Sequence, residues 1–167
     1  MGRDEQQAFD YLQKNWDLQK PVIEAYNGRL LKEMVDGILA SFSTASESVN
    51  AAISIQEKVM KEKYFQLRIG IHLGEVVFEK EDVFGDGVNI ASRIQSMASP
   101  GSIFISEVVA ANVSNKRGIH TRFVKVEKLK NVEEPVRIFE ILTSGSIPAS
   151  TETGKLNSRS LKTLQVQ

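Results

Sequence analysis

The sequence predicts an α+β domain in which helices pack against a largely antiparallel sheet. Segments with apolar residues at helical spacing alternate along the chain with short segments in which every second residue is apolar. The pair Asp36-Gly37 separates two short apolar runs, which is the pattern of a tight β-hairpin. The chain has 167 residues, 41% of them hydrophobic, and this is enough for one domain core.

Four helices are predicted from apolar periodicity and from capping signals. The first is bent or divided by Pro21 and ends at the pair Asn27-Gly28. Thr44 is followed three residues later by Glu47, a spacing that indicates a capping box and the start of the second helix. The third follows two glycines and stops before Pro100. The helices are expected over residues 9–26, 45–60, 88–98 and 107–112.

The predicted strands are short and lie between these helices. Gly74 separates an alternating apolar segment from a second apolar run, so we expect these two strands to form a pair of their own. The strands are expected over residues 29–34, 38–42, 67–73, 76–78, 103–106, 123–126 and 136–142.

Composition excludes several classes of function. The chain has 21 basic and 21 acidic residues, which argues against nucleic-acid binding and against a polybasic membrane anchor. It contains no cysteine, which excludes disulfides, thiolate metal ligands and cysteine nucleophiles. No apolar stretch approaches the ~20 residues that span a bilayer, so we expect no membrane insertion and a cytoplasmic location.

The last residues differ in composition from the rest of the chain. Residues 143–167 contain nine Ser or Thr, no aromatic residue, and three basic residues against one acidic residue. Residues 1–142 contain 18 basic and 20 acidic residues. We therefore expect a folded domain over 1–142 and a flexible tail or linker over 143–167, with a helix near 156–164 as the weaker alternative.

Five segments resemble, in order and spacing, the catalytic domain of class III adenylyl/guanylyl cyclases, and the adenylyl-like bacterial members in particular. They are GRLLKEMVDGILASF (28–42), LRIGIHLGEVV (67–77), EDVFGDGVNIASRI (81–94), SPGSIFIS (99–106) and EKLKNVEEPVRIFEI (127–141). The resemblance covers about residues 3–142 and implies a ferredoxin-like βαββαβ-type fold. It also implies a lyase that forms a 3′,5′-cyclic nucleotide and pyrophosphate in intracellular signalling, by in-line attack of the ribose 3′ oxygen on the α-phosphorus.

The resemblance assigns a metal ligand and two purine contacts. Asp36 is a ligand of a pair of divalent ions, Mg or Mn; taken alone, it is better explained as part of a hairpin turn. Lys32 and Asp82 take the positions that read the purine. Their donor and acceptor suit N1 and the N6 amine of adenine and mismatch guanine, so the expected substrate is ATP.

The pattern Val-Asn-x-Ala-x-Arg at 88–93 is the most specific signal. By resemblance Asn89 orients the ribose, Arg93 stabilises charge developing on the phosphates, and Lys130 contacts the triphosphate. Without the resemblance, Asn89 and Arg93 fit a solvated helix face and Lys130 an exposed loop. The family works as head-to-tail dimers with the sites in the interface, so a homodimer is expected, with regulatory domains attached in a larger signalling protein.

The chain departs from the family pattern at three places. The family has a strand carrying a second metal-binding Asp before the first helix, and nothing ahead of Gly2 matches it. We therefore expect the first strand to be absent from this chain, through truncation, and cyclase activity to be weak or lacking. Val35 stands where the family usually has Gly before the turn Asp, and Asn131 stands where Leu-Lys-Gly is usual. If φ must be positive at these two positions, strain is expected at Val35. The strain expected at Asn131 is smaller, because Asn tolerates left-handed geometry.

Two other classes of function remain open from the residues alone. One is a non-catalytic cyclase-homology domain that binds nucleotide or a partner and regulates it. The other is a structural dimerisation module, which would bind no nucleotide. His72 and His120 have no partner at metal-ligand spacing in the sequence, so both are interpreted as structural.

Overall fold

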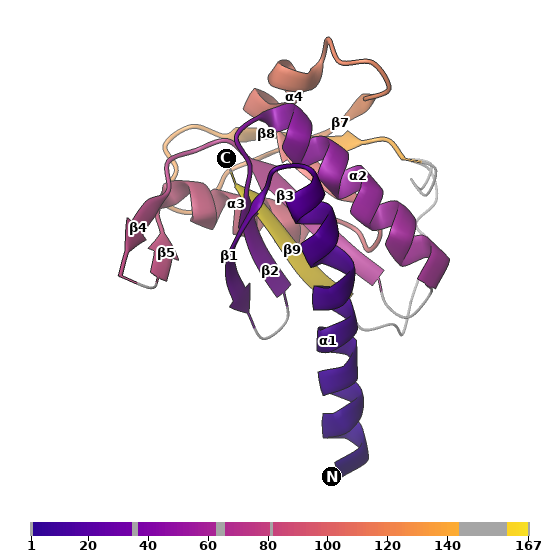
Figure 1. Cartoon of the computed structure of the whole chain (residues 1–167). Coiled ribbons are helices and arrows are strands. Elements are labelled where there is room, and N and C mark those ends of the chain that lie inside the picture. Colours follow the sequence, from indigo (N-terminus) through magenta and orange to yellow (C-terminus); the bar gives the residue numbers. More distant parts are fainter. Residues whose placement is uncertain (1, 35–36, 63–65, 81, 144–159, 167) are drawn as a thin grey trace.

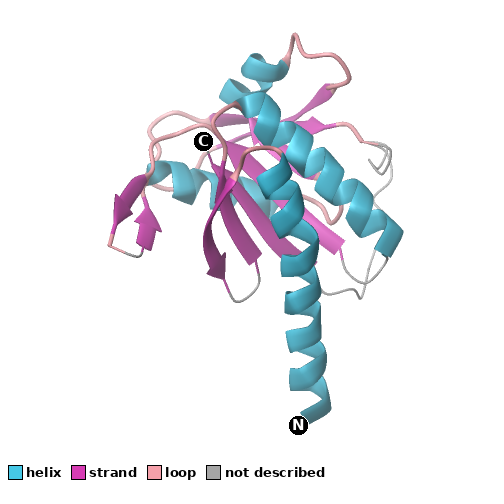
Figure 2. Cartoon of the chain, viewed as in Figure 1, coloured by secondary structure: helices cyan, strands magenta, loops and turns pink. Residues whose placement is uncertain are grey.

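The computed structural model describes residues 2–34, 37–62, 66–80, 82–143 and 160–166. The helices in these ranges are α1 (Gly2–Ala25), α2 (Ala45–Glu62), α3 (Asp86–Met97) and α4 (Glu107–Val113). The strands, magenta in Figure 2, are β1 (Arg29–Met34), β2 (Gly37–Ser41), β3 (Gln66–His72), β4 (Val77–Glu79), β5 (Asp82–Phe84), β6 (Ile103–Ser106), β7 (Thr121–Glu127), β8 (Val136–Ile141) and β9 (Ser160–Val166).

The strands form one large sheet and one small one. Seven strands lie in the order β1-β2-β9-β3-β6-β8-β7, and β4 and β5 form a separate two-stranded sheet. The outer pairs of the large sheet are antiparallel and the pairs in its middle are parallel. Helices α1 and α2 cover one face and α3 covers the other (Figure 1). The predicted α+β class is confirmed.

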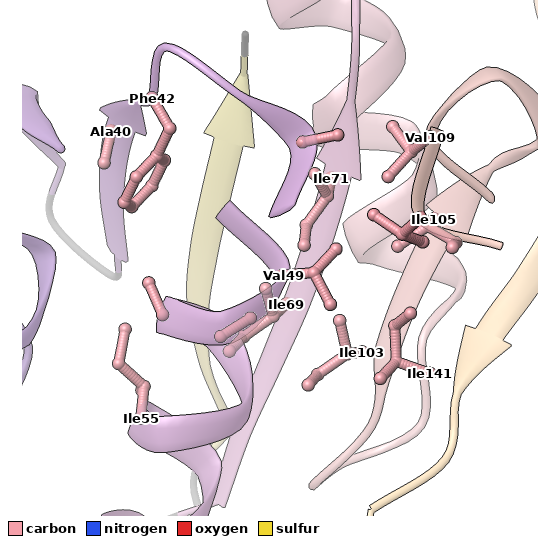
Figure 3. Packing of buried hydrophobic residues seen from close by; sticks show 14 of the residues in the cluster. Ala40, Phe42, Val49, Ile55, Ile69, Ile71, Ile103, Ile105, Val109 and Ile141 are labelled. Atoms are coloured by element: carbon pink, nitrogen blue, oxygen red, sulfur yellow. The ribbon is translucent and has the colours of Figure 1, made fainter. Parts of the chain in front are cut away.

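The main core lies between the large sheet and the two helices α1 and α2. Leu67, Ile69 and Ile71 alternate along β3 and are fully buried against α2, which contributes Val49 and Ile55 (Figure 3). Burying side chains of this size contributes about 1.5–3 kcal/mol each to the hydrophobic stabilisation. The period-two pattern in the sequence therefore identified the face of β3 that points to this core.

The local helix and hairpin signals are largely confirmed. The Thr44 hydroxyl oxygen accepts a hydrogen bond from the Glu47 backbone N–H at 3.1 Å, as the capping pattern predicts. Helix α1 ends at Ala25, one residue before its predicted end, and begins at Gly2, seven residues before its predicted start; Asn27 follows with a φ of 61°. Pro21 lies inside α1 and does not divide it. Strands β1 and β2 pair antiparallel as predicted.

One strand pairing predicted from the sequence is wrong. β3 pairs with β9 on one edge and with β6 on the other, so the run after Gly74 has no free edge of β3 to join. Instead, β4 pairs with β5, with Phe78 opposite Val83 and Glu79 opposite Asp82. Alternation identifies a strand and its buried face, but it does not identify the neighbour with which the strand pairs.

The end of the chain also differs from its predicted state. Residues 160–166, expected in a flexible tail or in a helix, form β9, which pairs parallel to both β2 and β3. The family strand that this chain is expected to lack would lie in the middle of the sheet, and β9 lies in the middle of this sheet (Figure 1). Pairing on both sides gives partners to the backbone N–H and C=O groups that β2 and β3 turn toward β9. Residues 144–159 lie outside the described ranges.

Helix α3 lies very close to β3 at Gly70, on the sheet face opposite the main core. A Cβ on Gly70 would lie 2.4 Å from the backbone N of Gln95 and 2.7 Å from the backbone O of Ala91. Both atoms belong to the α3 backbone, so a larger residue at this position can be accommodated only if the helix itself moves. Gly70 therefore sets the distance between α3 and the sheet.

We expect Gly70→Ala to destabilise the domain by about 1–3 kcal/mol, because overpacking against backbone forces the helix to shift. The free energy of unfolding in urea measures the effect. Gly2→Ala is the matched control, since a Cβ at Gly2 meets nothing within 4 Å. Equal stability of the two variants would show that α3 does not lie this close to β3.

None of the helices in the described ranges is both long enough and apolar enough to cross a membrane.

Candidate active site

The start of α3 is fixed by backbone contacts with the loop after β3. The Gly87 N–H donates to the carbonyl O of Glu75 at 3.1 Å, and the Asn89 N–H donates to the carbonyl O of Gly85 at 3.2 Å. A Cβ on Gly87 would lie 2.7 Å from that Glu75 oxygen, so only glycine allows the approach. The glycines read from the sequence as the start of a helix therefore position its first turn.

Three of the predicted site residues lie around one cavity. Asn89 and Arg93 come from α3, and Lys130 comes from the loop between β7 and β8. The cavity has a volume of about 390 Å³. It is lined by Asp86, Asn89, Ile90, Ser92, Arg93, Lys130, Asn131 and Val132. The fold thus brings together residues that are 37 to 41 positions apart in the sequence.

The loop that carries Lys130 is held by its neighbours. The Leu129 side chain is buried, and its carbonyl accepts a hydrogen bond from the Val132 N–H at 3.2 Å. Asn131 has a φ of 65°, the left-handed conformation that the usual glycine would adopt. This geometry agrees with the expectation that Asn at this position is a mild departure from the family pattern.

The charges around the cavity favour an anionic ligand. Arg93 and Lys130 are exposed, and neither forms an ion pair with another residue in the described part of the chain. The lining contains one carboxylate, Asp86, against these two cations. A guanidinium and an ammonium group that are not neutralised by protein carboxylates can donate charged hydrogen bonds to phosphate oxygens.

Lys32 and Asp82, predicted to read the purine, form an ion pair although they are 50 residues apart in the sequence. The distance between Lys32 Nζ and Asp82 Oδ1 is 2.9 Å, and both side chains are exposed. The Val83 N–H also donates to Asp82 Oδ1, at 2.8 Å. The hydrogen bond from Lys32, followed by that from Val83 and the Lys32 charge, holds the pKa of Asp82 below its usual value. Asp82 therefore stays an acceptor at neutral pH.

The ion pair joins β1 to the small sheet, next to the start of α3. β1 has an irregularity between Leu30 and Lys32, and β5, which carries Asp82, leads through Gly85 into α3. Neither Lys32 nor Asp82 lines the cavity of about 390 Å³. The described predicted residues thus form two groups, the ion pair between β1 and β5 and the three residues that line the cavity.

The predicted metal ligand cannot be placed. Asp36, like Val35, lies outside the described residues. Within the described ranges, no three or more His, Asp or Glu side chains lie together in a way that could hold a metal ion. The described residues do not, on their own, fit a metal centre.

A second and larger hollow lies away from these residues. Its volume is about 700 Å³, and it lies between α1 and α2. It is lined by Lys14, Asp17, Leu18, Pro21, Lys58, Lys61 and Glu62. None of the predicted site residues reaches it, so size alone does not identify the functional cavity in this domain.

Asp86 lines the cavity although it is not among the site residues predicted from the sequence. Asp86 lies three residues before Asn89 and seven before Arg93, which places all three on one face of α3. This helical spacing is the signal in the sequence that assigns Asp86 to the same face as Asn89 and Arg93.

Comparison with known proteins places this chain in a family. Residues 32–140 match the model of the family described as adenylate and guanylate cyclase catalytic domain. The putative adenylate cyclase 3 of Rhizobium meliloti (strain 1021) is 32% identical over 147 residues, covering 83% of this chain and 25% of the relative. The chain spans about a quarter of the length of the curated adenylate cyclases that it matches first.

Solved structures show the same fold. The adenylate/guanylate cyclase/hydrolase from Silicibacter pomeroyi superposes with a TM-score of 0.72 at 31% identity, covering 79% of this chain and 83% of that one. The adenylyl cyclase CyaB from P. aeruginosa gives a TM-score of 0.67 at 21% identity, covering 81% and 82%, which supports the fold alone. By the family match, by sequence identity and by fold, this chain belongs to the adenylate and guanylate cyclase catalytic domain family.

Proposed function

We propose that this domain converts ATP into 3′,5′-cyclic AMP and pyrophosphate. The observation that carries the proposal is the presence, in one chain, of the Lys32–Asp82 ion pair beside a cavity lined by Asn89, Arg93 and Lys130. A nucleoside triphosphate consists of a purine, a ribose and phosphates. The ion pair offers a donor and an acceptor to the purine, and the cavity residues offer polar and cationic groups to the ribose and the phosphates. The name adenylate cyclase given to the relatives supports the reaction class.

The cavity residues act on the ribose and the phosphates. Lys130 binds the triphosphate as a point charge, and Asn89 orients the ribose so that its 3′ oxygen is in line with the α-phosphorus. Arg93 donates hydrogen bonds to phosphate oxygens as negative charge increases on them in the transition state. Membership of the family implies two divalent ions, Mg or Mn, in each site. Asp36 is the one residue of this chain that we assign as a ligand of these ions.

The purine is read by hydrogen-bond polarity. The Lys32 ammonium donates to N1 of adenine and the Asp82 carboxylate accepts from the N6 amine. Guanine reverses both partners, since its N1 is protonated and its O6 accepts. Each mismatch costs about 1–3 kcal/mol, which is enough to favour ATP over GTP.

The proposal includes a head-to-tail homodimer. Asn89, Arg93 and Lys130 are exposed on the single chain, so a second copy placed over the cavity would exclude water from the phosphates. Such a dimer would have two sites, and Asp36 of one chain would belong to one site while Lys32 of the same chain would belong to the other.

We infer weak turnover for these 167 residues. The strands on either side of β2, which begins at Gly37 directly after Asp36, are β1 and β9. β9, with the sequence SLKTLQV, contains neither Asp nor Glu and so brings no second carboxylate beside Asp36.

The test is incubation of the chain with ATP or GTP and Mg or Mn, with cyclic nucleotide and pyrophosphate quantified by chromatography. Slow formation of cyclic AMP, with less cyclic GMP, is expected. Calorimetry with a non-hydrolysable ATP analogue and Mn measures binding separately. Neither binding nor product would overturn the proposal, and rapid turnover would contradict the inferred weakness.

The charge swap Lys32→Asp with Asp82→Lys is expected to move the preference from ATP toward GTP. The swap keeps an ion pair between β1 and β5 but reverses the donor and the acceptor offered to the purine. The ratio of the dissociation constants for ATP and GTP should change by roughly 10- to 100-fold. An unchanged ratio would exclude this pair from purine recognition.

The second candidate is a non-catalytic cyclase-homology domain that binds ATP or a partner domain and regulates it. Val35, which stands before Asp36 where the family usually has Gly, favours it. Binding of the ATP analogue without any cyclic AMP, under both metals, would select this alternative.

A further inference from the structure

The side chain of His72 lies at the end of β3, on the sheet face that carries α3. Its Nδ1 is hydrogen-bonded to Ser106 Oγ at 2.8 Å. Ser106 is buried at the end of β6, the strand parallel to β3, and it precedes α4. Burial lowers the pKa of His72 to about 4, so the ring is neutral at physiological pH. The ring is thus held at one edge by a buried hydroxyl.

The opposite edge of the ring lies close to the loop that follows β3. His72 Cδ2 and Nε2 lie 3.0 Å from where a Cβ of Gly74 would be. The next contact of this loop is with the start of α3. A Cβ on Gly87 would meet the carbonyl carbon and oxygen of Gly74 at 3.0 and 3.2 Å, and the Gly87 N–H donates to Glu75 O at 3.1 Å.

These contacts form a continuous path from Ser106 through the His72 ring and the Gly74-Glu75 backbone to Gly87. Gly87 is in the first turn of α3, two residues before Asn89 and six before Arg93. A shift of the loop toward the space of a missing ring would therefore rotate or translate the helix that carries both side chains.

We propose that His72 is a positioning residue for the candidate site, whose ring, fixed by Ser106, holds the Gly74-Glu75 backbone and with it the α3 end that aims Asn89 and Arg93 into the cavity. The inference rests on the proposed function and assigns a role to a residue that the sequence indicated only as structural. A displacement of about 1 Å at such a site can cost up to ~100-fold in rate.

The test uses three variants of the full chain. His72→Ala removes both the ring and its hydrogen bond, and Ser106→Ala keeps the ring but frees it. His120→Ala is the matched control, because His120 is the other histidine of the chain and is exposed. His72→Ala should raise the dissociation constant for a non-hydrolysable ATP analogue with Mn by roughly 10-fold. Ser106→Ala should raise it less, and His120→Ala not at all.

Two readouts separate positioning from a general loss of stability. The ratio of affinities for the ATP and GTP analogues should stay constant, because the Lys32–Asp82 ion pair joins β1 to β5 and neither residue lines the cavity. The backbone amide resonances of Gly87 and Asn89 should shift in His72→Ala and in Ser106→Ala, with or without nucleotide. The amide shifts therefore test the positioning even if the wild-type chain binds no nucleotide, a result that would overturn the proposed function alone.

The inference is overturned if the amide resonances of Gly87 and Asn89 in both variants coincide with those of His120→Ala. It is also overturned if the affinities for the two analogues fall in unequal proportion. If His72→Ala does not fold, Ser106→Ala decides the outcome by the same measurements.

Discussion

Removal of residues 160–167 is expected to abolish cooperative unfolding of the domain. β9 pairs with β2 from Gly37 to Ser41 and with β3 from Gln66 to His72. Each lost backbone hydrogen bond costs about 1 kcal/mol, and the total stability of a domain is about 5–15 kcal/mol. Losing a strand with partners on both sides therefore removes a large part of the stability.

A point variant tests the same pairing without shortening the chain. Leu164→Pro removes a backbone N–H in the middle of β9, opposite Leu39 on β2 and Gly70 on β3. We expect it to lower the unfolding temperature strongly. Arg3→Pro is the control, because proline is tolerated in the first turn of a helix such as α1.

The measurement is thermal unfolding followed by circular dichroism. If the shortened chain and Leu164→Pro unfold at the temperature of the full chain, β9 is not part of the folded sheet. These residues would then behave as the flexible tail that their composition predicts. The experiment thus decides directly between the compositional expectation and the observed strand.

Replacement of Arg93 by Ala is expected to have the largest effect on the chemistry. Arg93 is one of two cations at the cavity, and no carboxylate in the described ranges pairs with it. Removing a preorganised donor that stabilises transition-state charge typically costs about 10²–10³ in rate. The expected result is loss of cyclic AMP formation to below one hundredth of the wild-type rate.

Two further substitutions make this result specific. Arg93→Lys keeps the charge but loses the planar fork, so turnover should remain low while analogue binding largely recovers. Arg117→Ala removes an exposed arginine elsewhere and should leave both unchanged. Full cyclic AMP formation by Arg93→Ala would remove Arg93 from the proposed mechanism.

The proximity of the residues within each group follows in part from the sequence in one group and not in the other. Asn89 and Arg93 share a helix face, so their proximity follows from helical spacing alone. Lys32 and Asp82 are 50 residues apart, and no local pattern brings them together. Only the resemblance to a family predicted that they act together. Lys130 reaches the cavity because buried Leu129 anchors its loop, which is a property of packing.

The sequence by itself determined the α+β class, the approximate positions of the four helices and the β1–β2 hairpin. These follow from periodicity, capping and turn chemistry, which act between residues close in the chain. The tertiary structure alone decided that β3 pairs with β9 and β6, that α3 approaches the sheet at Gly70, and that the His72 ring lies between Ser106 and the loop after β3. Contacts between distant segments depend on which strand edges and helix faces remain free after packing. A local sequence pattern does not predict which edges and faces these are.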